Sequence, residues 1–381
     1  MRLLHTSDWH LGRLFHGASL LDEQAAAMDR IVALATEAEV DAVVIAGDLY
    51  DRAIPPAEAV QLFSDTLARL TATGAAVVAI AGNHDSHVRV STYDPLLSRF
   101  RVTIRGDVRR VAEPVTVTPR RGGDPVAIHP LPYLDPAVEG PGLGADGRLR
   151  HQEVTALALD RLPRDRRRSV LVAHTFVAGG SPSESERELT VGNVDHVSID
   201  TFAGFAYVAL GHLHGAQELD GPRLAYSGTP LPYSFSEQHH TKSVRIVDLD
   251  AAGRPTVEVV PLNVGRPLAT LEGTLETLLR DPRHDAQMAA RLRVILTDEQ
   301  LPLQAMARLR QRFPLVAELR HRPPERRRST ADDRRRQVQQ AATPLDLSLA
   351  FFGDQQGRPA DDAEADLLRQ ALEAAARRGE R

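Results

Sequence analysis

Five short motifs combine carboxylate, imidazole and amide side chains, and each follows a run of apolar residues. In chain order they are Asp8-Trp9-His10, Gly47-Asp48, Gly82-Asn83-His84-Asp85, His174 and Gly211-His212-Leu213-His214. Oxygen and imidazole-nitrogen ligands of this kind suit two divalent cations that together hydrolyse phosphate esters. Each motif alone is more often a turn or a structural histidine, but all five in this order are difficult to explain by chance. The sequence therefore predicts a two-metal site.

Two cations roughly 3.5–4 Å apart need one ligand that bridges them. Asp48 is the predicted bridge, because a carboxylate has two oxygens and a full negative charge, and Asp48 stands in the middle of the ligand set. Gly47 before it has no Cβ atom, so the chain can turn sharply there. The remaining predicted ligands form two sets, which are Asp8, His10 and His214 for one cation and Asn83, His174 and His212 for the other.

His84 directly follows Asn83, and we expect it to act on the substrate instead of binding metal. It would serve as a general acid or as a positive clamp on the scissile phosphate. Asp85 is expected to orient the ring of His84 through the other ring nitrogen. The cations would lower the pKa of a bound water, giving a hydroxide for in-line attack. Among the other histidines, His16 and His87 lie close in sequence to ligand motifs and could contact substrate phosphate.

Short apolar segments must carry these motifs as strands. They cover residues 2–6, 40–46, 75–81, 169–173 and 205–210, and each ends just before a motif. Apolar residues with helical spacing at 20–39 and 56–72 separate the first three segments. This alternation predicts an α/β fold, a two-sheet α/β sandwich with the ligands at the C-terminal ends of strands. Residues 224–227 and 243–249 are predicted antiparallel strands, and the polar segment 181–195 is a predicted surface loop.

The chain has 381 residues, too many for one typical core, so several domains are expected. The predicted parts are a catalytic domain at 1–266, a small α+β domain at 267–322, an arginine- and proline-rich linker at 323–343 and a helical segment at 344–381. The linker contains the runs Arg326-Arg327-Arg328 and Arg334-Arg335-Arg336. We interpret these runs as solvated, and a strap that contacts nucleic-acid phosphates is the alternative.

The helical segment begins with an ambiguous stretch at residues 344–352. Its apolar residues alternate as in a strand, but they also fit one face of a helix. Thr343 as an N-cap and Pro344 at the first helical position favour the helix. Residues 361–375 have the pattern of an amphipathic helix. Both pieces are too small to form a core alone, so we expect them to pack on another surface.

Composition limits the chemistry and the location. The chain has no cysteine, which excludes disulfides and thiolate metal sites and leaves oxygen and nitrogen ligands. A net charge of -5 gives no global sign of nucleic-acid binding, so any basic surface must be local. The N-terminal apolar stretch is too short for a signal peptide, and no later segment is long enough to span a bilayer. We therefore expect a cytoplasmic protein with no membrane partner.

The set of motifs resembles the calcineurin-like metallophosphoesterase superfamily. The segments Leu4-His5-Thr6-Ser7-Asp8-Trp9-His10-Leu11-Gly12 and Ala46-Gly47-Asp48-Leu49-Tyr50-Asp51-Arg52 are similar, more narrowly, to the SbcD family, the nuclease subunits of bacterial SbcCD complexes. So are the segments that begin at His174, Val208 and Tyr226. The resemblance is dense over residues 1–250, weaker over the small domain and faint at 344–357.

The resemblance implies a nuclease with two divalent metal ions, manganese with magnesium as the alternative. Such enzymes trim double-stranded DNA ends and cut single strands and hairpins in DNA repair, recombination and replication. It also implies a partner, the coiled-coil ATPase SbcC. Two copies of this chain would form a homodimer within a heterotetramer with that ATPase. The implied location is nucleoid-associated. Residues 267–322 would form a capping domain, and helices within 344–375 would dock on the ATPase. One departure is Asp51, which stands where archaeal and eukaryotic relatives have a histidine.

Two other function classes remain open. The first is a phosphatase or cyclic-nucleotide phosphodiesterase with the same metal site, a class that usually lacks the appended domain and helices. The second is a DNA-end-binding scaffold with an inactive site, against which the complete ligand set argues. The chain contains no P-loop, which agrees with ATP being handled by another subunit.

Overall fold

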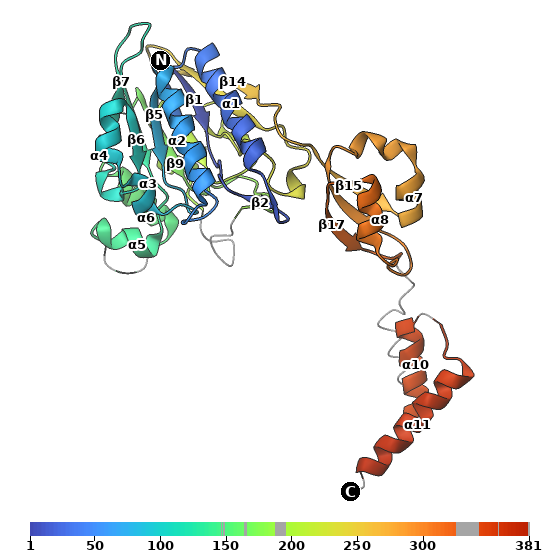
Figure 1. Cartoon of the computed structure of the whole chain (residues 1–381). Helices are drawn as coiled ribbons and strands as arrows, with labels where there is room; N and C mark the ends of the chain where they lie inside the picture. Colours follow the sequence, from blue (N-terminus) through green and yellow to red (C-terminus); the bar gives the residue numbers. More distant parts are fainter. Residues whose placement is uncertain are drawn as a thin grey trace. The chain divides into compact units, whose positions relative to one another are not determined.

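The computed structural model describes residues 1–145, 147, 149–163, 166–186, 196–324, 343–356 and 358–379 (Figure 1). Both arginine runs, most of the predicted linker and the end of the predicted surface loop lie outside these residues. The chain divides into two compact units. The larger comprises residues 1–271, 281–294 and 306–319, and the smaller comprises 272–280, 295–305 and 320–381.

The first sheet is built around the strand that ends just before Asp8 and His10. Its strands lie in the order β14 (Pro255–Pro261), β13 (Ser243–Leu249), β1 (Arg2–Thr6), β4 (Ala42–Ile45), β5 (Ala76–Ile80) and β6 (Val102–Arg105). β1, β4, β5 and β6 run parallel, so their C-terminal ends share one edge. β13 pairs antiparallel with β1, with Leu3 opposite Val247, as the sequence predicted for 243–249. β1 is thus completed by a strand from much later in the chain.

The second sheet carries the later motifs. Its strands lie in the order β11 (Gln217–Asp220), β12 (Leu224–Tyr226), β10 (Tyr207–Gly211), β9 (Ser169–His174), β8 (Val126–Leu131) and β7 (Val115–Val117). β8, β9 and β10 are parallel. The predicted antiparallel strand at 224–227 is antiparallel to β11 but parallel to β10, so that prediction was only half right.

The two sheets stack face to face and helices cover their outer faces. Apolar side chains from both sheets, such as Val44 and Val78 from the first and Val172 and Ala209 from the second, form the core between them. Helices α1 (Leu21–Glu37) and α2 (Ala57–Ala72) lie on the outer face of the first sheet (Figure 1). Helix α6 (His151–Leu159) packs in the core on the outer face of the second. The predicted two-sheet α/β sandwich is confirmed.

Helix α1 buries one face, and Met28, Ile31 and Leu34 of the predicted apolar spacing lie on it. In α1, the buried side chains include Ala27, Met28, Ile31, Leu34 and Ala35, which recur every three to four residues as one helix face does. Asp22 and Glu23 in the first turn favour the helix start, because the N-terminal end of a helix dipole is positive. Further short helices follow β5, namely α3 (His87–Ser91) and α4 (Asp94–Leu97), and α5 (Pro136–Gly142) precedes α6.

The region after residue 267 forms a separate three-stranded sheet in the order β15 (Leu268–Gly273), β16 (Arg291–Leu296) and β17 (Val316–His321). Helices α7 (Leu275–Arg280) and α8 (Ala305–Arg312) lie between the strands in sequence. Leu292, Val294 and Leu296 on β16 are buried, and the residues between them are half-buried. One face of this sheet therefore carries a core, as expected for a small α+β domain.

Two helices end the described chain, α10 (Pro344–Gln356) and α11 (Asp362–Gly379). The hydroxyl of Thr343 accepts a hydrogen bond from the Asp346 backbone N–H at 3.1 Å, which is N-cap geometry. The helical interpretation of the ambiguous stretch is confirmed. Leu347, Phe351 and Leu367 are exposed on these helices. Within the described residues, no helix is both long and apolar enough to cross a membrane.

Candidate metal centre

The predicted ligands come together where the strands of both sheets end. Asp8 and His10 follow β1, Asp48 follows β4 and Asn83 follows β5, while His174 and His212 lie at the ends of β9 and β10. The backbone N–H of Asp8 donates to the Gly47 carbonyl at 3.0 Å. The backbone N–H of His212 donates to Asp8 Oδ1 at 3.0 Å. The first bond joins neighbouring strand ends, and the second joins the two sheets.

The first predicted set lies within reach of a single cation. Asp8, His10 and His214 are buried, and one ligand atom from each lies within 4.8 Å of the others. The Nε2 atoms of His10 and His214 are 3.2 Å apart. At this distance the two imidazole nitrogens can form a hydrogen bond, or both can direct their lone pairs at one ion. The geometry therefore leaves the set free to act as the sequence predicts.

The second set converges in the same way, and Asp48 lies between the two. Asn83 Oδ1 is 2.9 Å from His174 Nε2 and 3.2 Å from His212 Nδ1. Asp48 Oδ2 is 3.5 Å from His10 Nε2 and also 3.5 Å from His174 Nε2. One carboxylate oxygen thus faces a member of each set, which is the position that a bridging ligand needs.

Several of these residues have strained backbones. Asp8, His10, Asp48 and His212 have φ values of 52°, 44°, 48° and 112°, in the left-handed region that side chains with a Cβ disfavour. Such strain concentrates at functional sites, where the surrounding structure holds it. At Gly211 a Cβ atom would lie 1.8 Å from the Ala46 carbonyl oxygen. Only glycine fits there, because the ends of the two sheets meet at that point.

The electrostatics fit a cation pair. Burial, followed by the charge of Asp48, raises the pKa of Asp8. Burial is also the largest cause that lowers the pKa of His10, His174 and His212. The imidazoles therefore stay neutral and keep a lone pair, while the crowded carboxylates need positive charge beside them. Buried oxygen and neutral nitrogen donors that converge in this way fit two divalent cations.

His84 lies beside this cluster. Its backbone N–H donates to Asp48 Oδ1 at 2.8 Å, and its Nδ1 atom is 2.8 Å from the carbonyl oxygen of Asp51. A ring nitrogen of His84 also lies within 4.8 Å of ligand atoms of His10 and Asp48, so the geometry alone permits a metal-binding role. Its role on the substrate stays a prediction.

The predicted contact between Asp85 and the ring of His84 was wrong. Asp85 instead accepts backbone hydrogen bonds from Leu49, Tyr50 and Gly82 at 3.0, 3.0 and 2.9 Å. A carboxylate near several unpaired amides satisfies them in preference to one ring nitrogen, because buried N–H groups need acceptors. Asp85 therefore ties together the two loops that carry Asp48 and Asn83.

Three residues near the motifs have polar or aromatic neighbours at the edge of the site. Arg13 donates to Asp51 Oδ1 at 3.0 Å, so the residue that departs from the family pattern forms an ion pair. His87 Nδ1 lies 3.7 Å from Glu139. The ring of His16 packs 5.5 Å from the Phe235 ring. The predicted contacts of His16 and His87 with phosphate stay predictions.

Sequence reasoning missed a group of polar residues behind His214. Ser185 lies in the predicted surface loop, yet its hydroxyl oxygen is 2.5 Å from His214 Nδ1. Glu186 accepts the backbone N–H of His214 at 2.7 Å. Glu237 and Lys242 form a buried ion pair at 2.5 Å next to them. A polar loop carries no periodicity, so nothing in residues 181–186 indicated that they turn inward; residues 187–195 lie outside the described part.

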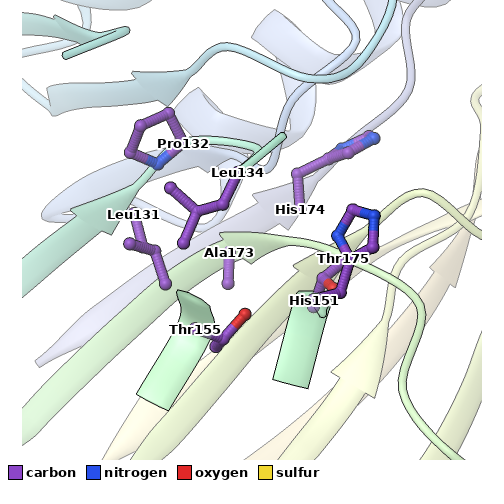
Figure 2. Close-up of a pocket in the computed structure, with 8 residues that line it drawn as sticks. All are labelled: Leu131, Pro132, Leu134, His151, Thr155, Ala173, His174 and Thr175. Atoms are coloured by element: carbon purple, nitrogen blue, oxygen red, sulfur yellow. The ribbon is translucent and has the colours of Figure 1, made fainter. Parts of the chain in front are cut away.

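A small cavity lies next to His174. Figure 2 shows the residues that line it, among them His151 and Thr155 from α6 and Thr175 next to His174. Its volume of about 10 Å³ is close to what one water molecule needs. His151 is buried here, and its side chain lines the same cavity as His174. Residues of α6 therefore lie beside the end of β9, which carries His174.

The sequence matches two families over separate regions. Residues 1–216 match the calcineurin-like phosphoesterases. Residues 264–355 match the SbcD_C family, described as the Type 5 capsule protein repressor C-terminal domain.

Curated relatives match over most of the chain. Identity to SbcD of the SbcCD nuclease from Bacillus subtilis (strain 168) is 36% over 330 residues, which cover 82% of this chain and 84% of that protein. Identity to SbcD of the SbcCD nuclease from Escherichia coli (strain K12) is 32% over 292 residues, or 73% and 72% of the two chains. The protein of the same name from Staphylococcus saprophyticus is 32% identical over 295 residues, 74% of each chain.

Proposed function

Because this chain belongs to the SbcD family of calcineurin-like phosphoesterases, we propose that it is the nuclease component of an SbcCD-type complex. It would cut phosphodiester bonds of DNA, as an exonuclease on double-stranded ends and as an endonuclease on single strands and hairpins. The relatives are named as the SbcD component of the SbcCD nuclease, which supports a DNA substrate and an SbcC partner. The proposed setting is DNA repair and recombination in the cytoplasm, at the nucleoid.

The position of Asp48 carries the proposal. Its Oδ2 atom lies 3.5 Å from a histidine of each ligand set, which supports two cations with one shared carboxylate. Asp8, His10 and His214 would hold one cation, and Asn83, His174 and His212 would hold the other. Two divalent cations there would activate water and offset the charge of the phosphate. The oxygen and imidazole donors suit manganese, and magnesium is the alternative.

His84 is the proposed residue that acts on the leaving group. Its Nδ1 atom faces the Asp51 carbonyl oxygen, which can only accept, so this nitrogen carries a proton. The other ring nitrogen is then the one that can exchange a proton with the leaving oxygen or contact the phosphate. The hydrogen bond from its backbone to Asp48 keeps the ring next to the metal cluster.

Helices α10 and α11 are the proposed contact with the ATPase. Leu347, Phe351 and Leu367 are 43%, 66% and 66% exposed, although large apolar side chains favour burial. An amphipathic helix that places such residues on a groove or a coiled coil is a common recognition mode. The match to SbcD_C reaches into α10, which supports a family-specific role for this segment.

A homodimer within a heterotetramer is the proposed assembly. A groove of 610 Å³ lies between α2 and the α3–α4 region, and its lining is mostly apolar. Val60, Tyr93 and Phe100 line it and are 44%, 64% and 72% exposed. Pairing two copies would cover these side chains. In the complex with the ATPase, Tyr93→Glu with Phe100→Glu should lower the mass measured by light scattering, and a wild-type complex with only one copy of this chain would contradict the assembly.

Cleavage of a DNA hairpin tests the proposed activity. The full chain, purified with its ATPase partner, should cut the hairpin only with manganese or magnesium, and Asp48→Asn should not. A small phosphodiester and a cyclic nucleotide serve as competing substrates. Rapid turnover of these alone, with intact DNA, would favour the phosphatase or phosphodiesterase alternative. Metal-independent DNA binding without turnover of any substrate would favour the scaffold.

A further inference from the structure

His214 is held from behind by a chain of polar groups that the proposed reaction does not use. Its Nε2 atom faces His10, while its Nδ1 atom lies 2.5 Å from the hydroxyl oxygen of Ser185. That hydroxyl donates to Glu237 Oε1 at 2.5 Å. Glu237 Oε2 in turn accepts from Lys242 Nζ at 2.5 Å. A buried ion pair is thus linked through one serine to one predicted metal ligand.

The protons available along this series of polar groups determine the tautomer of His214. Lys242 keeps Glu237 ionised, because an ammonium beside a buried carboxylate stabilises its negative charge. Ser185 has a single hydroxyl proton, and it donates this proton in the hydrogen bond to the Glu237 carboxylate. The contact between Ser185 and His214 must then have Nδ1–H of the histidine as the donor. The proton of a neutral ring is thereby placed on Nδ1, and Nε2 keeps the lone pair that a cation needs.

The same groups also hold the backbone of His214. Lys242 Nζ donates to the His214 carbonyl at 2.9 Å and to the Thr229 hydroxyl at 2.7 Å. Glu186 accepts the backbone N–H of His214 at 2.7 Å. Both the ring and the main chain of this residue are therefore fixed.

His10, in the same ligand set, is different. Its Nδ1 atom is buried and has no hydrogen-bond partner among the described residues. An oxygen of Asp51 lies 3.7 Å from this nitrogen, beyond hydrogen-bond distance. The polar chain thus distinguishes one of the two histidines of the set.

We infer that Ser185, Glu237 and Lys242 are positioning residues that prepare His214 for the cation shared with Asp8 and His10. The inference rests on the proposed metal site. It assigns a function to the described residues 181–186, which bring Ser185 next to His214. Groups that orient a metal-binding histidine typically change metal affinity about 10–100-fold when removed. Only one of the two cation sites should depend on these three positioning residues, since Asn83, His174 and His212 do not contact them.

Calorimetric titration of the metal-free full chain with manganese tests the inference. Wild type should bind two ions. Ser185→Ala should weaken one of the two binding steps about 10–100-fold and leave the other unchanged. Ser185→Thr keeps the hydroxyl and should restore binding. Ser181→Ala, an exposed serine in the same segment, is the matched control and should bind as wild type does.

A second readout separates positioning from a general loss of structure. In nitrogen-15 spectra of histidine-labelled, metal-free protein, His214 should be the Nδ1–H tautomer in wild type and a mixture of tautomers in Ser185→Ala. Glu237→Gln should shift the same signal and weaken the same binding step. If that variant does not fold, the serine variants still decide the result.

Three outcomes would count against the inference, and they can be told apart. A wild type that binds fewer than two ions would remove the proposed metal site, and this inference with it. A wild type that binds two ions, with unchanged affinities and an unchanged tautomer in Ser185→Ala, would overturn the inference alone. Equal losses in Ser185→Ala and in the Ser181→Ala control would overturn it as well.

Discussion

The Nδ1 atom of His84 lies 2.8 Å from the carbonyl oxygen of Asp51, 33 positions earlier in the chain. A carbonyl oxygen cannot donate, so the contact places a proton on Nδ1 and orients the ring. The carboxylate of the same Asp51 pairs with Arg13 at 3.0 Å. The backbone of Asp51 thus orients a histidine, while its side chain forms the edge of the site.

His84→Gln tests the role of this ring. If His84 serves the leaving group and not a cation, the variant should keep both manganese ions and lose roughly 10²–10⁴-fold in turnover, the usual contribution of general acid catalysis. Metal content by mass spectrometry and hairpin cleavage on the same preparation would measure both quantities. Loss of one ion from the variant would show that His84 is a ligand.

Asp48→Asn tests the bridge. An amide lacks the negative charge that both cations share, so the variant should weaken both manganese-binding steps and abolish hydrolysis. Asp94→Asn is the matched control, because Asp94 is also buried but lies outside the ligand sets. Titration calorimetry would measure both variants. Wild-type turnover of Asp48→Asn at saturating manganese would rule out the two-metal assignment.

Deletion of residues 344–381 tests the helical segment. The truncated chain should keep its metal content and manganese-dependent cleavage, because every predicted ligand precedes the deletion. It should lose co-purification with the ATPase. The double variant Phe351→Glu and Leu367→Glu in the full chain should do the same, since both side chains are exposed on the helices. Undiminished ATPase binding would contradict the docking role, and loss of metal would mean that the helices support the catalytic domain.

Because His5 is buried, we expect the protein to lose stability in acid. It is fully buried on β1, and burial lowers its pKa from 6.5 to about 3. Between pH 6.5 and about pH 3, the unfolded chain therefore binds a proton at His5 that the folded chain does not bind. The stabilising contribution is complete above pH 6.5 and falls as pH drops toward 3, by up to about 1.4 kcal/mol per pH unit.

Urea unfolding at pH 7 and pH 5 would measure this effect in wild type and in His5→Gln. The variant should show a smaller decrease in the free energy of unfolding between the two pH values. Part of the decrease should remain, because burial also lowers the pKa of His129 to about 4. Identical pH dependence in both proteins would contradict the assignment to His5.

The sequence predicted which motifs meet because parallel strands make position predictable. A residue that directly follows a buried parallel strand lies at the C-terminal edge of its sheet, so the order of motifs was enough to bring Asp8, Asp48 and Asn83 together. The helix at 344 was predictable for a local reason as well. Thr343 caps it with its own side chain, and that contact needs no tertiary structure.

Side-chain partners in loops were not predictable in this way. Asp85 is two residues from Asn83. Its carboxylate accepts hydrogen bonds from backbone amides that come near it only when the loops are folded. Ser185 lies in a polar segment whose composition fits solvent equally well. The pairing of β12 with β10 also depends on a crossover of the chain, which local residue pattern does not encode.

β1 pairs on one side with β4 and on the other with β13, where Arg2 lies opposite Asp248, 246 positions later. At a synthesis rate of about 5–20 residues per second, one edge of β1 stays open on the ribosome for roughly 10–50 s. An open strand edge is a template for pairing with other chains. A nascent chain halted before Ser243 would already contain every predicted metal ligand. It would nonetheless expose the edge of the strand that precedes Asp8 and His10, so such a fragment should aggregate or recruit a chaperone.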